Sequence, residues 1–292
     1  MFANYFNKVL MQIFYGKAAL IVHLKSINNN YSTVGFVPTM GALHQGHLSL
    51  IQESIANNTT TVVSIFVNPT QFSNLEDLAK YPRTLENDIE KIRGLSSKVI
   101  VYAPTDDDVY EGKTVSETFN FDGLENLMEG KFRPGHFNGV GTIVKRLFEI
   151  IEPTNAYFGE KDFQQLQIVK KMVAKNKINV NVIGCPIFRE PNKLAMSSRN
   201  ELLSLKEKQD AAIIYKTLAE SKENFKKMSV KMVTAQVEKS FKNYPSFSLE
   251  YYQIADEESL LPCIRKSKKK KYRAFIAVFV NNIRLIDTIS LN

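Results

Sequence analysis

Two histidines, His44 and His47, lie three residues apart in the segment PTMGALHQGH, although the whole chain contains only four histidines. The segment follows an apolar run and precedes a helical pattern. At this spacing the two imidazoles project from one side of a first helical turn. Gly41 and Gly46 carry no Cβ and would let the backbone approach a nucleotide. The imidazoles could then donate hydrogen bonds to phosphate oxygens as charge moves onto a leaving pyrophosphate.

An isolated H-x-x-H has simpler interpretations. The two histidines could cap or pack a helix end, and for this motif alone we prefer that interpretation. A metal site needs a third ligand, and neither Cys185 nor Cys263 is near in the sequence. Four further polar segments change the preference.

Two of these segments contain amides and a guanidinium. In FVNPTQF, Asn68 and Gln71 could address a small polar substrate, whereas a simple Asn-Pro turn is the alternative. FRPGHFNGVGT is predicted to place Arg133 and His136 in a loop before a helix. Arg133 could bind a carboxylate or phosphate through two parallel hydrogen bonds. A surface ion pair is about as good an interpretation of that segment alone.

In the third segment, AYFGEKDFQQL, a strand ends at Gly159 and a polar cluster opens a helix. Lys161 could neutralise phosphate, Asp162 could accept hydrogen bonds from ribose hydroxyls, and Gln165 points from the first turn. The alternative is an acidic helix start with Lys161 in solvent.

The fourth segment is MSSRN, at residues 196–200. Its two hydroxyls and one guanidinium could close over a triphosphate, and a plain linker is the alternative. Five such clusters, four of them at predicted strand ends, together indicate one nucleotide site.

The elements that must position these residues alternate between strand and helix. The predicted strands are Val34 to Val37, Val62 to Val67, Val99 to Ala103, Ala156 to Phe158 and Val180 to Ile183. The predicted helices are Leu48 to Ala56, Leu85 to Ile92, Val140 to Ile151 and Phe163 to Ala174. This alternation predicts an α/β fold, a doubly wound parallel sheet with ligands at the carboxyl ends of its strands.

The pattern changes near residue 190. Two polar helices are predicted at Lys206 to Lys226 and Val230 to Asn243, and strands at Ser246 to Ile254 and Tyr272 to Ile289. Asn281-Asn282 is predicted to turn the last stretch into a hairpin. We therefore expect a catalytic domain over residues 1–187 and a second, smaller α+β domain over residues 188–292.

Composition limits the class of protein. The 292 residues are 44% hydrophobic and 23% charged, which argues against disordered and fibrous classes. No stretch approaches the roughly 18 apolar residues of a membrane span. The two cysteines form no C-x-x-C pattern, so the expected location is the reducing cytoplasm.

The net charge of +8 is local. The run RKSKKKKYR, from Arg265 to Arg273, holds seven cations and no acid, so only +1 lies elsewhere. A solvated loop is the commoner explanation of such a run, and RNA or an anionic surface is the less common one.

The combination of motifs resembles a known family. H-x-G-H at a helix start, with a later Ser-rich basic loop, resembles the nucleotidyltransferases that include class I aminoacyl-tRNA synthetases. The ordered set PTMGALHQGH, FVNPTQF, YPRT, FRPGHFNGV, AYFGEKDFQQL and MSSRN, from about Thr33 to Leu202, resembles the pantothenate synthetase (pantoate–β-alanine ligase) family. That resemblance implies a Rossmann-like catalytic domain, a small C-terminal lid and a homodimer.

The resemblance also implies the reaction: ATP and Mg²⁺ are used to join pantoate to β-alanine through a pantoyl adenylate, with release of AMP and pyrophosphate. The implied catalytic residues are His47, His44, Lys161, Ser197, Ser198 and Arg199. The implied ATP-binding residues are Met40, Gly41, Ala42, Leu43, His44, Gln45, Gly46, His47, Gly159, Glu160, Lys161, Asp162, Phe188, Met196, Ser197, Ser198 and Arg199. Gln71 and Gln165 are implied to hold pantoate, Arg133 is expected to bind substrate, and no metal ligand is assigned.

Two features depart from the family pattern or extend it. Phe188 stands where the family usually has valine lining the adenine, so an inward side chain would weaken ATP binding and a backbone contact would preserve it. The residues before Met11 look like an extension or an alternative start.

The resemblance also implies that the segment from Phe72 to Tyr81 forms a flexible wall over the substrate.

Two competing functions stay open at this point. A cytidylyl- or adenylyltransferase would share H-x-G-H but retain the nucleotide in its product, and the paired glutamines favour an uncharged hydroxy-acid pocket instead. An RNA-binding protein would use the Arg265 to Arg273 run but would leave the five nucleotide-site motifs without a purpose.

Overall fold

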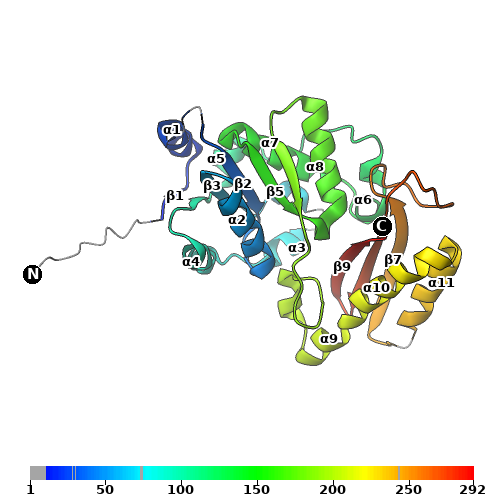
Figure 1. Cartoon of the computed structure of the whole chain (residues 1–292). Helices are drawn as coiled ribbons and strands as arrows, with labels where there is room; N and C mark the ends of the chain where they lie inside the picture. The colour runs from blue at the N-terminus through cyan, green and yellow to red at the C-terminus, as the bar shows by residue number, and fades with distance from the viewer. Residues whose placement is uncertain (1–10, 28, 30, 73–74, 243) are drawn as a thin grey trace, which may run out of the picture.

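The computed structural model describes residues 11–27, 29, 31–72, 75–242 and 244–292. The proposed extension before Met11 lies outside the described residues. Six strands form one parallel sheet in the order β1-β4-β3-β2-β5-β6 (Figure 1). Their bounds are β1 Ile13–Phe14, β2 Val34–Thr39, β3 Thr60–Ile65, β4 Ile100–Tyr102, β5 Asn155–Gly159 and β6 Asn181–Cys185.

Alternate residues of these strands pack on opposite faces of the sheet, as the strand period of two requires. Phe36 and Val62 contribute to the core on one face, and Val37 and Val63 to the core on the other. Helices α1 (Lys17–Ile27), α7 (His136–Ile151) and α8 (Phe163–Asn176) cover the first face. Helices α2 (Gln45–Asn57) and α4 (Leu85–Leu95) cover the second (Figure 1).

The strand order reverses at β2. Strands β3 and β4 extend the sheet to one side of β2, and β5 and β6 extend it to the other. β2 pairs with β5 only at Gly35 and Phe36, whereas its pairing with β3 continues to Thr39. Pro38, which has no backbone N–H, lies where the two strands have separated. The split opens the point at which doubly wound sheets bind their ligands.

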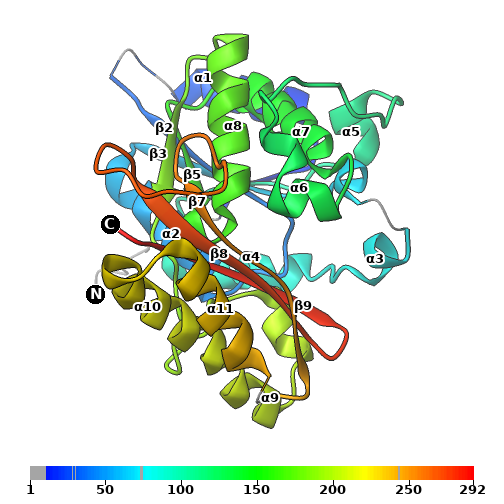
Figure 2. The same cartoon turned by 90° about the vertical axis from the view of Figure 1, so that its right-hand side faces the viewer.

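A second layer follows β6. Strands β7 (Phe247–Asp256), β8 (Tyr272–Val280) and β9 (Ile283–Ser290) form an antiparallel sheet. Helices α10 (Ala212–Lys227) and α11 (Val230–Phe241) cover one of its faces (Figure 2). On the other side, Phe275 packs against Phe163 of α8 with 6.0 Å between ring centroids, so this sheet adjoins the parallel one.

The predicted fold class is confirmed: a doubly wound parallel sheet with a separate, smaller α+β unit. The hairpin turn at Asn281-Asn282 is also confirmed, with Asn281 at a φ of +51°. The predicted helix Lys206 to Lys226 is interrupted: α9 (Leu205–Asp210) ends before α10 begins at Ala212. The division between residues 187 and 188 stays a prediction.

Several short elements were not predicted. They are β1, α1, α3 (Leu75–Lys80), α5 (Asp106–Tyr110) and α6 (Met128–Phe132), together with 3₁₀ turns at Pro69–Gln71, Leu124–Asn126, Glu160–Asp162 and Ser198–Leu202. Most hold only one or two turns, too few for an apolar period to show in the sequence.

Candidate active site

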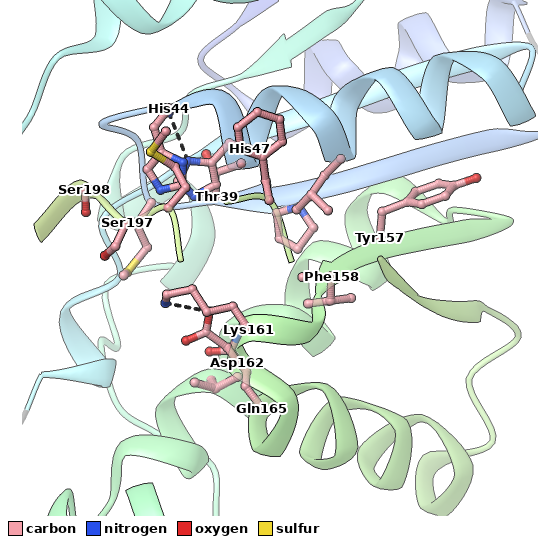
Figure 3. Close-up of a pocket in the computed structure, with 18 of the residues that line it drawn as sticks. Thr39, His44, His47, Tyr157, Phe158, Lys161, Asp162, Gln165, Ser197 and Ser198 are labelled. Atoms are coloured by element: carbon pink, nitrogen blue, oxygen red, sulfur yellow. Dashed lines mark hydrogen bonds and ion pairs between the residues drawn. The ribbon is translucent and has the colours of Figure 1, made fainter. Parts of the chain in front are cut away.

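A cavity of about 240 Å³ opens at the carboxyl ends of β2 and β5, where the strand order reverses. Segments far apart in the sequence meet there. Figure 3 shows His44 and His47 at the start of α2 opposite Lys161, Asp162 and Gln165 at the start of α8. The sequence-predicted residues that line it are Met40, His44, Gly46, His47, Gln71, Gly159, Lys161, Asp162, Gln165, Phe188, Met196, Ser197, Ser198 and Arg199.

Six predicted site residues do not line this cavity. Leu43 is 1% exposed and belongs to the core, and Gln45 is exposed to solvent. Glu160 instead pairs with Arg273 of β8, with 3.0 Å between Oε2 and Nη2. Arg133 lines a neighbouring cavity. Gly41 and Ala42, the remaining two, shape the loop before α2 rather than the cavity wall.

The two histidines interact directly. Their rings stack with 4.0 Å between centroids, and the backbone N–H of His44 donates to Nδ1 of His47 at 3.3 Å. Nδ1 of His47 is therefore unprotonated, and its Nε2 carries the hydrogen. Gly46 leaves room for the ring of His44, because a Cβ at residue 46 would lie only 3.0 Å from Nδ1 of His44.

The pKa values of both histidines are depressed. Burial, and then the charge of Lys161, lowers the pKa of His44 to about 4. Burial and the neighbouring His44 lower the pKa of His47 well below its ordinary value. Both imidazoles are neutral at pH 7, and Nδ1 of His44 has no hydrogen-bond partner among the described residues. Neutral N–H donors without partners suit phosphate oxygens.

Asp88 of α4 holds the loop that precedes the histidines. Its carboxylate accepts the backbone N–H of Ala42 at 2.9 Å and that of Leu43 at 2.7 Å. Gly41 and Ala42 have φ angles of +82° and +49°, a left-handed conformation that needs such support outside glycine. Lys91, one turn later on α4, donates to the carbonyl oxygen of Leu43 at 2.6 Å.

The sequence reasoning missed Asp88 and Lys91. A signal was present, because Asp88 lies on the same helix face as Leu85, Ile89 and Ile92, and Asp88 is fully buried. An acid on an apolar helix face needs internal partners.

Gln71 is oriented by residues behind it. Nδ2 of Asn68 donates to Oε1 of Gln71 at 2.9 Å, and the hydroxyl of Tyr110 donates to Oδ1 of Asn68. Asn68 is fully buried and lines neither this cavity nor its neighbour, so the structure places it behind Gln71, and a contact of Asn68 with substrate stays a prediction. Asn68 instead leaves the Nε2 hydrogens of Gln71 as donors.

His136 is the first residue of α7 and not part of a preceding loop, which corrects the prediction. Its Nδ1 lies 2.9 Å from the carbonyl oxygen of Gln71. Arg133 ends α6, and its Nη1 lies 3.2 Å from Nε2 of His136. A carbonyl only accepts, so Nδ1 carries the proton and Nε2 accepts from Arg133.

The second wall of the cavity comes from the turn before α8. Lys161 lies 3.3 Å from Asp162 and is mostly buried. Gln165, one turn into α8, faces the same space as Lys161 (Figure 3). A lysine, a carboxylate and an amide are thus placed within one helix start.

The predicted Ser-Ser-Arg loop forms an ordered 3₁₀ turn, with the hydroxyl of Ser197 accepting the backbone N–H of Arg199 at 3.3 Å. Met196 donates its backbone N–H to the carbonyl oxygen of Phe188 at 3.0 Å, so the two strips of chain lie side by side. Phe188 is 40% exposed and lines the rim of the cavity.

The wall expected from Phe72 to Tyr81 is described except at residues 73–74. Phe72 and Tyr81 meet edge to face with 5.6 Å between ring centroids, and α3 lies between them in the sequence. Tyr81 lines the cavity.

Metal ligands are not gathered in the described part of the chain, which contains no group of three His, Cys, Asp or Glu side chains that could hold an ion. Mg²⁺ bound chiefly by substrate phosphates and water needs no such group.

The basic run is only partly a solvated loop. Arg273 is 5% exposed and pairs with Glu160 and Glu257, and Lys270 lies 3.5 Å from Asp256. Lys266 donates to the carbonyl oxygen of Phe225. These internal contacts weaken the RNA-binding interpretation.

None of the helices in the described ranges is long and apolar enough to cross a membrane.

Comparisons with known proteins agree with this geometry. A pantothenate synthetase from Flavobacterium psychrophilum is 64% identical over 281 residues, which are 96% of this chain and all of that protein. One from Christiangramia forsetii is 50% identical over 282 residues, 97% of this chain and all of that protein.

Solved structures agree as well. The pantothenate synthetase of Thermus thermophilus superposes with a TM-score of 0.86 at 36% identity, covering 96% of this chain and 99% of the other. The pantoate-β-alanine ligase of Francisella tularensis, solved with β-γ ATP and β-alanine, superposes with a TM-score of 0.79 at 33% identity. This match covers 96% of this chain and 98% of the other. The profile of the family described as pantoate-beta-alanine ligase matches residues 12–290. The chain belongs to the pantoate-β-alanine ligase family.

Proposed function

We propose that this protein is an ATP-dependent ligase that condenses pantoate with β-alanine to pantothenate through a pantoyl adenylate, releasing AMP and pyrophosphate. One observation carries the proposal: Gln71 and Gln165, which suit a hydroxy acid, face the same cavity as the neutral histidines and Lys161. The Francisella tularensis relative, solved with β-γ ATP and β-alanine, supports the same assignment of substrates.

In the first step, Gln71 and Gln165 hold pantoate so that its carboxylate attacks the α-phosphorus of ATP in line. A P–O bond to the pantoate oxygen forms, and the bond to pyrophosphate breaks. Pyrophosphate leaves with the electron pair. Both substrates are held in one cavity, which removes most of the entropic cost of bringing them together.

The charge that develops in this step is met by groups on both walls of the cavity. We assign phosphate contacts to His44, His47, Lys161, Ser197, Ser198 and Arg199, and the ribose to Asp162. Gly46 and Gly159 allow close approach of the backbone, and Met40, Phe188 and Met196 border the nucleotide. Donors fixed in place before the reaction stabilise the transition state without reorganising.

In the second step, the uncharged amine of β-alanine attacks the acyl carbon and expels AMP. The mixed anhydride must be kept from water until then. The β7-β8-β9 sheet adjoins the site through Phe275 and Arg273, and these contacts support the proposal that this unit acts as the lid.

Three further assignments belong to this proposal. Mg²⁺ would enter with the phosphates of ATP, in keeping with the lack of a protein-only metal cage in the described residues. A homodimer is proposed from the family resemblance. A cytoplasmic location is supported by two buried cysteines without disulfides.

The test follows ATP, pantoate and β-alanine together and measures AMP, pyrophosphate and pantothenate. Pantothenate and AMP in equal amounts, only when all three substrates and Mg²⁺ are present, would support the ligase. A product that retains the nucleotide would favour the nucleotidyltransferase alternative. No consumption of pantoate by folded protein that binds ATP would overturn the assignment of the acid substrate.

A further inference from the structure

A second cavity, of about 130 Å³, continues from the first. Gln71 and Gln165, the proposed pantoate ligands, line both cavities. From there the second cavity runs toward the antiparallel sheet, where Tyr251 and Arg284 line it. A second small molecule could therefore reach the acyl group of bound pantoate from this side.

Two of the charged side chains around the second cavity are already engaged in ion pairs. Arg284 pairs with Glu129 at 2.7 Å and with Glu250 at 2.5 Å. Asp287 is bound by two nitrogens of Arg189, at 2.7 and 3.0 Å. These pairs hold the cavity walls together, and neither Arg284 nor Arg189 is left as a free cation for a ligand.

Arg133 differs from these residues. Its hydrogen bond goes to the neutral His136, and no carboxylate of the described residues lies within ion-pair distance of it. Arg199, the other arginine without such a partner here, lines both cavities, whereas Arg133 lines only the second. Of these two cations, only Arg199 reaches the cavity proposed for the triphosphate, and Arg133 is confined to the second cavity.

His136 fixes the orientation of Arg133. Nε2 of His136 accepts a hydrogen bond from Nη1 of Arg133, and Nδ1 of His136 donates one to the carbonyl oxygen of Gln71. The remaining N–H groups of the guanidinium stay available. Burial lowers the pKa of Arg133, but an arginine side chain nevertheless stays protonated. Arg133 is therefore a poorly hydrated cation that can bind an anion.

The second step of the reaction supplies such an anion. The amine of β-alanine must meet the acyl carbon beside Gln71 and Gln165, and its carboxylate, two methylene groups away, must then lie farther along the second cavity. An ionised carboxylate in a narrow cavity needs a charged, hydrogen-bonding partner.

We propose that Arg133, positioned by His136, binds the carboxylate of β-alanine in the second cavity and thereby selects amines that carry a carboxylate. This proposal rests on the ligase function proposed above. The amine nitrogen forms the C–N bond, the C–O bond to phosphate breaks, and AMP leaves with the electron pair. The two protons lost by the ammonium group pass to water.

The test separates the two half-reactions. Pantoate-dependent exchange of pyrophosphate into ATP, without β-alanine, measures adenylation. Formation of AMP measures the second step, with either β-alanine or propylamine, which replaces the carboxylate by a methyl group. In Arg133→Met, we expect exchange to change less than about threefold and KM for β-alanine to rise roughly 100-fold, as for loss of a buried charge partner. Turnover of propylamine should stay unchanged.

Two further variants complete the test. Lys131→Met removes an exposed cation two residues away and should leave KM for β-alanine unchanged. Arg133→Lys keeps the charge and should recover part of the loss, and it replaces Arg133→Met if that variant does not fold.

Three results would overturn the proposal. Equal losses with both amines would give Arg133 a structural role, and a loss of exchange as large as the loss of amide formation would place it on pantoate or ATP. If the wild-type protein showed no pantoate-dependent exchange, the ligase function itself would fail, which the exchange assay detects separately.

Discussion

The carboxylate of Asp88 accepts the backbone N–H of Leu43 at 2.7 Å, although 45 residues separate the two in the sequence. The same carboxylate accepts from Ala42. One side chain on α4 therefore sets the left-handed turn that delivers His44 and His47 to the cavity. Asp88 lines neither the cavity of the two histidines nor the neighbouring one, and it acts as a positioning residue.

Replacing Asp88 by Ala should leave the buried backbone N–H of Leu43 and the partly buried N–H of Ala42 unpaired. We expect the free energy of unfolding to fall by about 1–3 kcal/mol and kcat to fall by at least tenfold, because the histidines lose their support. Urea unfolding and steady-state kinetics measure these effects. Glu90→Gln, on an exposed acid of the same helix, is the matched control. A stable Asp88→Ala variant with full activity would contradict the positioning role.

His47 and Lys161 are expected to contribute mainly to the transition state. Removing one fixed charge-stabilising donor typically costs on the order of 10² to 10³ in kcat, so His47→Ala or Lys161→Ala should lose most turnover. Circular dichroism should show an unchanged fold in each variant. If either variant turned over at nearly the wild-type rate, its assigned contact with phosphate would be wrong.

The histidines should make the protein sensitive to acid. The pKa values of His44 and His136 are each lowered from 6.5 to about 4, mainly by burial. Between these pH values the unfolded chain binds protons that the folded chain does not. The free energy of unfolding should fall with falling pH, by up to roughly 1.4 kcal/mol per pH unit for each histidine.

Urea unfolding at pH 7, 6 and 5 measures this dependence. The carboxylates contribute equally to the pH dependence of the wild type and of a His136→Gln variant. The difference between their free energies of unfolding at each pH therefore reports the contribution of His136. The variant should show a shallower loss of stability toward pH 5. Parallel curves for the two proteins would mean that His136 does not carry a depressed pKa.

Arg273 joins the antiparallel sheet to the site. Its guanidinium pairs with Glu160 at 3.0 Å and Glu257 at 3.1 Å, and its Cζ lies 3.9 Å from the ring centroid of Phe163. Arg273→Met would leave two partly buried carboxylates without this partner. We expect a loss of about 3 kcal/mol in the free energy of unfolding.

Arg265→Met, on an exposed cation of the same basic run, is the control for charge alone. Adding Glu160→Gln to Arg273→Met should restore part of the stability, because one of the uncompensated charges is removed. A loss below about 1 kcal/mol for Arg273→Met, or no recovery in the double variant, would argue against a structural ion pair.

Much of the parallel sheet could be predicted, because its strands and helices are long enough for local periodicity to show. The strand that begins at Val34 and the helix that ends at Ile151 were recovered at those ends. Motifs at strand ends also indicated the site, since parallel strands bring their carboxyl ends to one edge. The sequence alone thus determined the fold class, the family and most residues that line the cavity.

The partners of those residues depended on tertiary structure. That Asp88 reaches Leu43, that Asn68 reaches Gly139, and that Glu160 pairs with Arg273 all depend on contacts between distant segments. Such contacts leave no periodic signal along the chain. Likewise, only the packing of the second sheet beside α8 brings Tyr251 and Arg284 to the second cavity, which Arg133 also lines. Residue type and spacing identify which groups can do chemistry, but burial and long-range hydrogen bonds decide which of them face the substrate.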